Sequence, residues 1–152
     1  LLDAAPPKGD AARRSPHFSL RAYPYVLYDL VLYIPRMLMN VNGRGVAAAR
    51  AVYPDIALTD TLLVHDELQR AFGKVSFKQG GSAAGHNGVK SVQHHLGNDV
   101  PRIRIGIDRP LDGNVSAYVL GSMPPDWLET CAHGEVLERL WSTLQTWCLS
   151  RT

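Results

Sequence analysis

The segment between residues 61 and 97 constrains the fold more than any other part of the sequence. It opens with Thr61–His65, a short apolar run typical of a buried strand, and Asp66 follows directly. Residues 73–79 then alternate apolar and polar side chains, which indicates a half-buried strand that runs into the glycine-rich loop 80–88. Strands that alternate with helices predict an α/β fold. Asp66 is then expected at the carboxyl end of a strand, where open α/β sheets place their ligands.

The residues after this loop carry the start and stop signals of a helix. His86 or Asn87 can cap the first turn, and Gly97 stands where a C-terminal glycine belongs. The apolar stripe of the helix consists of Val89, Val92 and Leu96. We expect the whole segment to gather an acid, an imidazole, a carboxamide and helix N–H groups around one cleft.

The N-terminal part of the chain predicts one strand and one helix after an irregular start. Residues 1–24 are rich in proline and charge without periodicity, and they read as an irregular lead-in. Tyr25–Ile34 is rich in Val, Leu and Tyr and stops at Pro35, as a strand does. Asn42 is expected to cap a helix that ends at the turn 53–55.

The C-terminal part predicts one further strand and a long helix. Isoleucine and polar residues alternate over 102–107, the clearest strand pattern in the chain. Val115–Leu120 reads either as a short strand or as the entry to the last helix. That helix is expected to begin at Pro124 and Pro125, and its apolar stripe extends over 128–147. Cys131 and Cys148 lie in that one helix, too far apart to form a disulfide.

Composition and length fit one ordinary globular domain. The chain has 152 residues, of which 45% are hydrophobic, so we expect a single core and one domain over residues 25–152. The net charge of +2 allows an anionic partner without requiring one. No apolar run approaches the roughly 20 residues of a membrane span, and no signal peptide opens the chain. Because the first residue is Leu1 and not Met, we expect these residues to be part of a longer product.

Single residues leave the chemistry open. Asp66 could orient a catalytic histidine, bind a cation or merely cap a turn, and Asn87 at a helix start is also common structural chemistry. The loop 80–88 lacks the lysine of a Walker loop and the spacing of a dinucleotide fingerprint, which argues against a nucleotide cradle. The histidines show no recognised zinc spacing, and His94 and His95 are expected on different helix faces.

Water is the expected nucleophile of any hydrolytic reaction here, because the chain has no G-x-S-x-G elbow and neither cysteine lies near the loop. Basic residues flank the segments around the loop. They suit a phosphate backbone or form a solvated basic face: Lys74, Lys78, Lys90, Arg102, Arg104 and Arg109.

Four segments, taken together, resemble the bacterial-type peptidyl-tRNA hydrolase family. They are Met-Asn-x-x-Gly at 39–43, Val-His-Asp-Glu-Leu at 64–68, Gly-Gly-Ser-Ala-Ala-Gly-His-Asn-Gly at 80–88 and Arg-Ile-Arg-Ile-Gly-Ile at 102–107. Their order and spacing match the family over roughly residues 26–123, and the Ser-Ala-Ala variant of the loop looks like the eukaryotic, organellar branch. The resemblance implies a single three-layer α/β/α domain around a twisted mixed sheet that lacks its first strand.

The resemblance also implies a function. It is hydrolysis of the ester that joins a peptide to the 3′ ribose of tRNA, which recycles tRNA after abortive translation and ribosome rescue. It implies a monomer that acts on peptidyl-tRNA in the mitochondrion or the cytoplasm, with no cofactor, metal or membrane.

Position by position, the resemblance assigns roles to seven residues. Asp66 matches the acid that orients and polarises the family's catalytic histidine. Asn40 and Asn87 match the carboxamides that position the ester and the attacking water. The implied substrate-binding residues are Met39, His86, Lys78 and Arg104, of which the last two match basic residues that hold a 5′ phosphate.

This sequence departs from the family upstream. A Gly-Leu-Gly-Asn-Pro strand and a Thr-Arg-His-Asn-type turn, whose histidine is the general base, are not found, and His17 lacks the flanking residues of that turn. Three hypotheses follow: the larger C-terminal part of a peptidyl-tRNA hydrolase, a non-catalytic RNA-binding relative, or an unstable truncated product. Ala83 and Asp108, where histidine and glycine are usual, are expected to retune the cleft without abolishing it.

Overall fold

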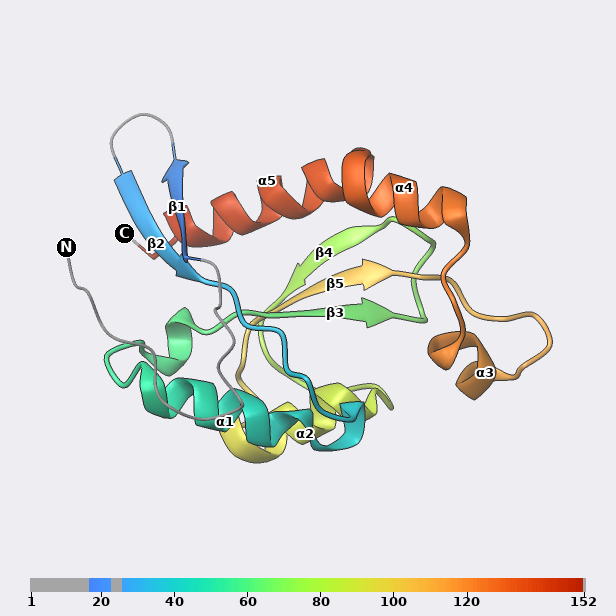
Figure 1. Ribbon diagram of the computed structural model, residues 1–152, viewed down its shortest axis with the longest axis horizontal. Helices are drawn as coiled ribbons and strands as arrows, with labels where there is room; N and C mark the ends of the chain where they lie inside the picture. The colour runs from blue at the N-terminus through green and yellow to red at the C-terminus, as the bar shows by residue number, and fades with distance from the viewer. Residues whose placement is uncertain (1–16, 23–25, 152) are drawn as a thin grey trace. The chain divides into compact units, whose positions relative to one another are not determined.

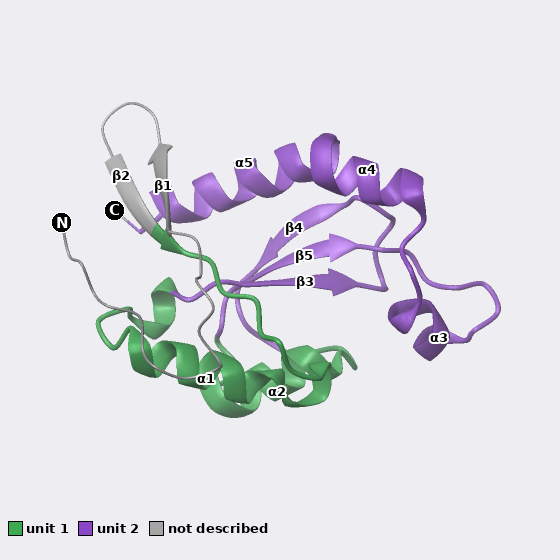
Figure 2. Cartoon of the chain, in the orientation of Figure 1, with its two compact units in different colours: residues 1–60, 82–99 green, residues 61–81, 100–152 purple. Residues whose placement is uncertain are grey.

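A computed structural model of the chain describes residues 17–22 and 26–151. The chain divides into two compact units, and each is built from two stretches of sequence (Figure 2). Unit 1 comprises residues 1–60 and 82–99, and unit 2 comprises residues 61–81 and 100–152. The chain therefore crosses from one unit to the other three times.

The first two strands form an antiparallel hairpin in which His17 lies opposite Val31. The strand expected over Tyr25–Ile34 is confirmed as β2 (Val26–Val31). Its partner β1 (His17–Ala22) falls within the range expected to be irregular, and its sequence alternates polar and apolar residues with the period of a strand. Residues 1–16 of the expected lead-in lie outside the described residues.

The helical part of unit 1 packs α1 against α2. Its elements are η1 (Met39–Val41), α1 (Asn42–Val52), η2 (Leu58–Asp60) and α2 (Asn87–Leu96). The helix expected after the glycine-rich loop is confirmed as α2, with Val89 and Val92 1% exposed and Leu96 9% exposed. It ends at Gly97, whose φ of 87° is a conformation that favours glycine.

The expected capping role of Asn42 is wrong, because Asn42 is already the first helical residue of α1. The 3₁₀ turn η1 runs directly into α1, so the chain is turning before Asn42 is reached. The N-cap position is taken by Val41, whose side chain makes no capping hydrogen bond. The first turn of α1 is thus capped from elsewhere, as described below.

Unit 2 is built on a three-stranded mixed sheet in the order β3-β5-β4 (Figure 1). The central strand β5 (Arg102–Gly106) is parallel to β3 (Leu63–Glu67) and antiparallel to β4 (Val75–Lys78). Ile103, the second residue of this strand, is fully buried. The expected α/β class and mixed sheet are confirmed.

The register of this sheet gathers most of its polar side chains on one face, which also carries Leu63. His65 pairs with Arg104 across β3 and β5, Ser76 pairs with Arg104 across β4 and β5, and Lys78 pairs with Arg102. Paired residues share a face of the sheet, so these residues form one polar face. The opposite face carries Val64, Asp66, Val75, Phe77, Ile103 and Ile105.

Three helices follow the sheet: α3 (Val115–Leu120), α4 (Pro125–His133) and α5 (Glu135–Leu149). Neither expectation for Val115–Leu120 holds, since this segment is a separate short helix capped by the Asn114 side chain. The single helix expected over 124–147 is also wrong, because it breaks at Gly134. Glycine is a poor residue for a helix interior, and Glu135 and Glu138 favour a new N-terminus there.

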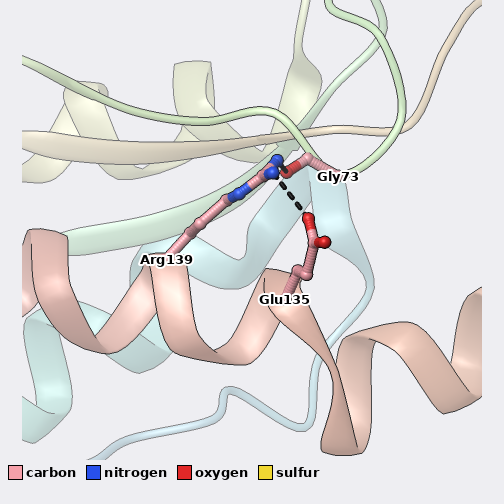
Figure 3. Close-up of polar contacts among 3 residues, drawn as sticks. All are labelled: Gly73, Glu135 and Arg139. Carbon is pink, nitrogen blue, oxygen red and sulfur yellow. Dashed lines mark hydrogen bonds and ion pairs between the residues drawn. The ribbon is translucent and has the colours of Figure 1, made fainter.

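Helix α5 packs along β4 and β5. Arg139 donates a hydrogen bond to the Gly73 carbonyl at 3.3 Å and pairs with Glu135 at 2.6 Å (Figure 3). The two cysteines are free, Cys131 on α4 and Cys148 on α5. A bilayer-spanning helix is not found in the described part of the chain, where every helix is too short or too polar for that role.

Candidate functional site

Two of the three predicted catalytic residues line one groove in unit 1. Asn40 lies in η1 and Asn87 is the first residue of α2, and both are exposed. The groove encloses about 500 Å³, and its other lining residues are Val41, Arg44, Lys90, Ser91, His94 and His95. Two carboxamides thus line one groove together with cationic and imidazole side chains.

Two close approaches hold η1 and α1 against α2. At Gly88 a side-chain Cβ would lie 2.8 Å from the Met39 Cγ, so the predicted substrate-binding residue Met39 packs directly on the first turn of α2. At Gly43 a Cβ would lie 2.0 Å from the carbonyl oxygen of Ser91. Each helix therefore contributes one glycine to the contact, and the segments that carry Asn40 and Asn87 approach to backbone distance.

His86 fixes the start of α2 and thereby the position of Asn87. Its Nδ1 accepts a hydrogen bond from the Val89 backbone N–H at 3.2 Å, the geometry of an N-cap. A ring nitrogen that accepts carries no proton, so the neutral ring is protonated at Nε2. The structure gives His86 a capping role, and its predicted contact with substrate stays a prediction.

Asp66 belongs to unit 2, whereas both amides belong to unit 1. It is the fourth of five residues in β3, one position inside the strand rather than directly after it, and it is half-buried. Its register partner is Ile105, so its carboxylate lies on the apolar face of the sheet. The neighbouring His65 donates from Nδ1 to the Asp66 carbonyl at 2.6 Å. The expected convergence of Asp66 with the two amides stays a prediction.

The predicted phosphate-binding residues Lys78 and Arg104 share the polar face of the sheet. Burial, and then the neighbouring charge of Arg70, lowers the pKa of Arg104, while Glu67 opposes this shift. Within the described residues, the Arg104 Nε is buried and has no hydrogen-bond partner. The Lys78 side chain reaches Gly81, where a Cβ would lie 3.8 Å from its Nζ. Positive charge on this face exceeds what Glu67 neutralises, which favours an anion.

Arg102 has a different role from the one expected of it. It is 2% exposed, and its Nη2 donates to the carbonyls of Gly80 and Gly81 at 2.8 and 2.9 Å. Burial, followed by the charge of Arg104, lowers the pKa of Arg102. Arg102 therefore braces the start of the glycine-rich loop.

Sequence reasoning did not assign a site role to four polar residues that line the groove: Arg44, Ser91, His94 and His95. Helical spacing is the signal that could have found them. Residues 91, 94 and 95 follow Asn87 by one or two helical turns, and Arg44 follows Asn40 by one turn. His94 and His95 were expected on different helix faces, yet one groove takes in both of them. Both line the groove, with ring centroids 5.1 Å apart in an edge-to-face arrangement.

The groove can polarise a carbonyl and hold a water molecule, because each carboxamide offers both donors and an acceptor. A covalent nucleophile is not evident in it, since the Ser91 hydroxyl is engaged as an acceptor for the Gly43 N–H at 2.9 Å. The two cysteine thiols lie elsewhere, and burial raises the pKa of each, which makes them poor nucleophiles. The arrangement suits attack by water on an ester or amide.

Comparisons with known proteins agree on one family. The family described as peptidyl-tRNA hydrolase matches residues 13–151. The chain is 46% identical over 100 residues to the peptidyl-tRNA hydrolase of Pelobacter propionicus, covering 65% of this chain and 51% of that protein. It is 48% identical over 100 residues to the probable peptidyl-tRNA hydrolase of Mus musculus, covering 64% and 48%.

Solved structures give the same result. The crystal structure of peptidyl-tRNA hydrolase from Acinetobacter baumannii matches with a TM-score of 0.60 and 36% sequence identity, over 66% of this chain and 52% of that one. The chain spans about half the length of the curated relatives it matches.

Proposed function

Because this chain belongs to the peptidyl-tRNA hydrolase family, we propose that it hydrolyses the ester that joins a peptide to the 3′ ribose of tRNA. The observation that carries the proposal is the groove of unit 1, in which Asn40 and Asn87 lie together. In the reaction, the oxygen of water adds to the ester carbonyl carbon and the bond from that carbon to the ribose oxygen breaks. The proton lost by water goes to the ribose oxygen, so the products are a peptide acid and a free tRNA 3′ hydroxyl.

The two amides are proposed to act on the ester carbonyl and on the attacking water. One carboxamide N–H₂ holds the developing oxyanion, and the second side chain positions the attacking water. Asp66 is proposed to orient and polarise the histidine that takes the proton from water. That histidine belongs to the family's Thr-Arg-His-Asn-type turn, which does not occur in this sequence.

The polar face of unit 2 is proposed to bind the tRNA phosphate. Lys78 and Arg104 lie on this face, and the unpaired Arg104 Nε supplies a donor that needs an acceptor. A phosphate provides both negative charge and acceptor oxygens. Removing either side chain is expected to weaken tRNA binding and to reduce its dependence on salt.

We further propose that the protein acts on peptidyl-tRNA as a monomer, in the mitochondrion or the cytoplasm. The support is the organellar form of the glycine-rich loop together with the similarity to the mouse protein. Light scattering during gel filtration tests the oligomeric state. Cell fractionation tests the compartment.

The activity is tested by release of N-acetyl-phenylalanine from N-acetyl-phenylalanyl-tRNA. Two proteins are compared, the chain itself and the same chain with the family's N-terminal strand and histidine-bearing turn added. We expect the extended protein to release the acetylated amino acid, and Asn87→Ala to lower its kcat about 10²- to 10³-fold. Asn98→Ala, which removes an exposed amide just beyond α2, is the matched control and should leave kcat unchanged.

The same assay distinguishes the RNA-binding alternative. An extended protein that binds the tRNA tightly and releases nothing would contradict the hydrolase proposal and favour a non-catalytic relative. In that case, salt-sensitive binding should fall when Lys78 and Arg104 are both replaced by alanine, whereas Arg36→Ala, which removes an exposed positive charge outside the basic set around the loop, serves as the control.

A further inference from the structure

The first turn of α1 is capped by a residue from another helix. Its own N-cap position is Val41, which offers no side-chain acceptor. The Gly43 N–H, one of the unpaired donors of that turn, instead donates to the Ser91 Oγ on α2 at 2.9 Å. A serine hydroxyl is a preferred N-cap acceptor, and here it is supplied across 48 residues of sequence.

The cap lies at a point where the two helices approach each other closely. A Cβ on Gly43 would lie 2.0 Å from the Ser91 carbonyl oxygen and 2.8 Å from the His95 Cδ2. Any side chain at this position would push α1 away from α2. Glycine at position 43 and serine at position 91 therefore act together, one permitting the approach and the other fixing it with a hydrogen bond.

This contact lies within about one helical turn of each of the two amides of the groove along its own segment. Asn40 precedes Gly43 by three residues in the continuous η1–α1 turn, and Asn87 precedes Ser91 by one turn of α2. Ser91 also lines the groove itself. A shift of α1 along α2 would therefore change the separation of the Asn40 and Asn87 side chains.

We propose that Ser91 is a positioning residue for hydrolysis, which acts by fixing the Asn40 amide relative to the Asn87 amide. The proposal rests on the proposed function, because it assumes that both amides act on the ester or the water. Displacements of about 1 Å in a catalytic constellation cost on the order of 10²-fold in rate. Loss of one cap, which loosens the contact without abolishing it, is expected to cost roughly tenfold.

The test uses the protein that turns over N-acetyl-phenylalanyl-tRNA in the assay above. Ser91→Ala should lower kcat roughly tenfold while KM changes less than about twofold, because alignment and not binding is lost. Ser91→Thr keeps the hydroxyl acceptor and should recover most of kcat. Ser116→Ala, on the exposed surface of α3, is the matched control and should behave as the wild type.

A double variant separates positioning from simple stabilisation. If Ser91 acts through Asn40, then adding Ser91→Ala to Asn40→Ala should lower kcat less than about twofold further. Effects that multiply in the double variant, or a Ser91→Ala kcat within twofold of the wild type, would overturn the positioning role alone. A wild type without turnover would overturn the proposed function and the positioning role together.

Amide hydrogen exchange supplies a readout that does not depend on activity. The Gly43 N–H should exchange faster in Ser91→Ala than in the wild type, and Ser91→Thr should restore its protection. If Gly43 exchange is unchanged in Ser91→Ala, the cap itself is refuted, whatever the kinetics show.

Discussion

Arg102 holds a buried positive charge that serves the backbone of the glycine-rich loop. Its Nη2 donates to the carbonyls of Gly80 and Gly81, both of which have positive φ, 53° and 81°. A loop start in this conformation exposes carbonyls that helix or sheet pairing cannot satisfy. A single terminal nitrogen of the guanidinium serves both acceptors through its two hydrogens.

We predict that Arg102→Met lowers the free energy of unfolding by about 3 kcal/mol, because two charge-assisted hydrogen bonds to buried backbone are lost. Arg102→Lys should recover only part of this loss. Urea denaturation gives the measurement, with the exposed Arg109→Met as a control expected within about 0.5 kcal/mol of the wild type. Equal losses of stability in Arg102→Met and Arg109→Met would show that Arg102 does not brace the loop.

Tyr118 ties α3 to the end of β5, since its hydroxyl donates to the Ile107 carbonyl. Burial, and then the carboxylate of Asp108, raises the pKa of Tyr118 above its ordinary value. A raised pKa means that the folded protein holds this proton more tightly than the unfolded chain. The stability it contributes is therefore fully present below the unfolded pKa of about 10 and is lost as pH rises through the folded pKa.

We predict that the stability of the wild type falls more steeply above about pH 10 than that of Tyr118→Phe. At neutral pH the order is reversed, because the variant lacks one hydrogen bond and should be less stable by about 1 kcal/mol. Urea midpoints measured at pH 8 and at alkaline pH test both statements. Parallel pH dependence in the two proteins would refute the role of Tyr118.

At the scale of elements, α1 contains two buried glycines with different neighbours. A Cβ at Gly43 would strike the backbone carbonyl of Ser91 at 2.0 Å. At Gly45 it would meet the hydroxyl of Tyr33 at 2.8 Å and the sulfur of Met37 at 3.3 Å, both at the far ends of side chains. Backbone cannot move aside without separating the helices, whereas side-chain ends can.

We predict that Gly43→Ala destabilises the protein by about 3 kcal/mol or more, as overpacking against backbone does. Gly45→Ala should stay within about 1 kcal/mol of the wild type, because improved helix propensity offsets the smaller clash. The two variants make the same chemical change in the same helix. The difference between their free energies of unfolding, measured by urea denaturation, therefore reports which atoms the added methyl group meets. Similar losses in both would contradict the proposed contact of Gly43 with α2.

Elements whose signals are local were predictable from the sequence. All the signals for α2 lie within 12 residues of sequence: its apolar stripe, its His86 cap and its Gly97 end. The alternation that predicts β5 is equally local. The cap of α1 was not predictable, because its acceptor is Ser91, 48 residues away. The break at Gly134 depends on two glutamates that favour a new helix start over one continuous stripe. The placement of Asn40 and Asn87 along one groove was expected only from the family resemblance, since no local pattern specifies it.

At the scale of the whole molecule, each unit is closed by a segment of the other. The two parts of unit 1 are joined through residues 61–81, which form β3 and β4 of unit 2. The two parts of unit 2 are joined through residues 82–99, which contain α2 of unit 1. If one unit unfolds while the other stays folded, the connecting segment becomes a disordered loop of about 20 residues. The folded unit must keep the two ends of this loop close together, which costs roughly 2–3 kcal/mol in closure entropy.

This coupling predicts that a lesion in one unit is felt by the other. All three tryptophans of the chain, Trp127, Trp141 and Trp147, belong to unit 2 and report on that unit alone. Gly43→Ala damages a contact within unit 1, yet we expect it to lower the urea midpoint measured by tryptophan fluorescence as well as that measured by far-ultraviolet circular dichroism. Gly45→Ala should leave both midpoints in place. A fluorescence midpoint that stays fixed in Gly43→Ala while the dichroism signal falls early would mean that the units unfold independently, because closure entropy would then be too small to link them.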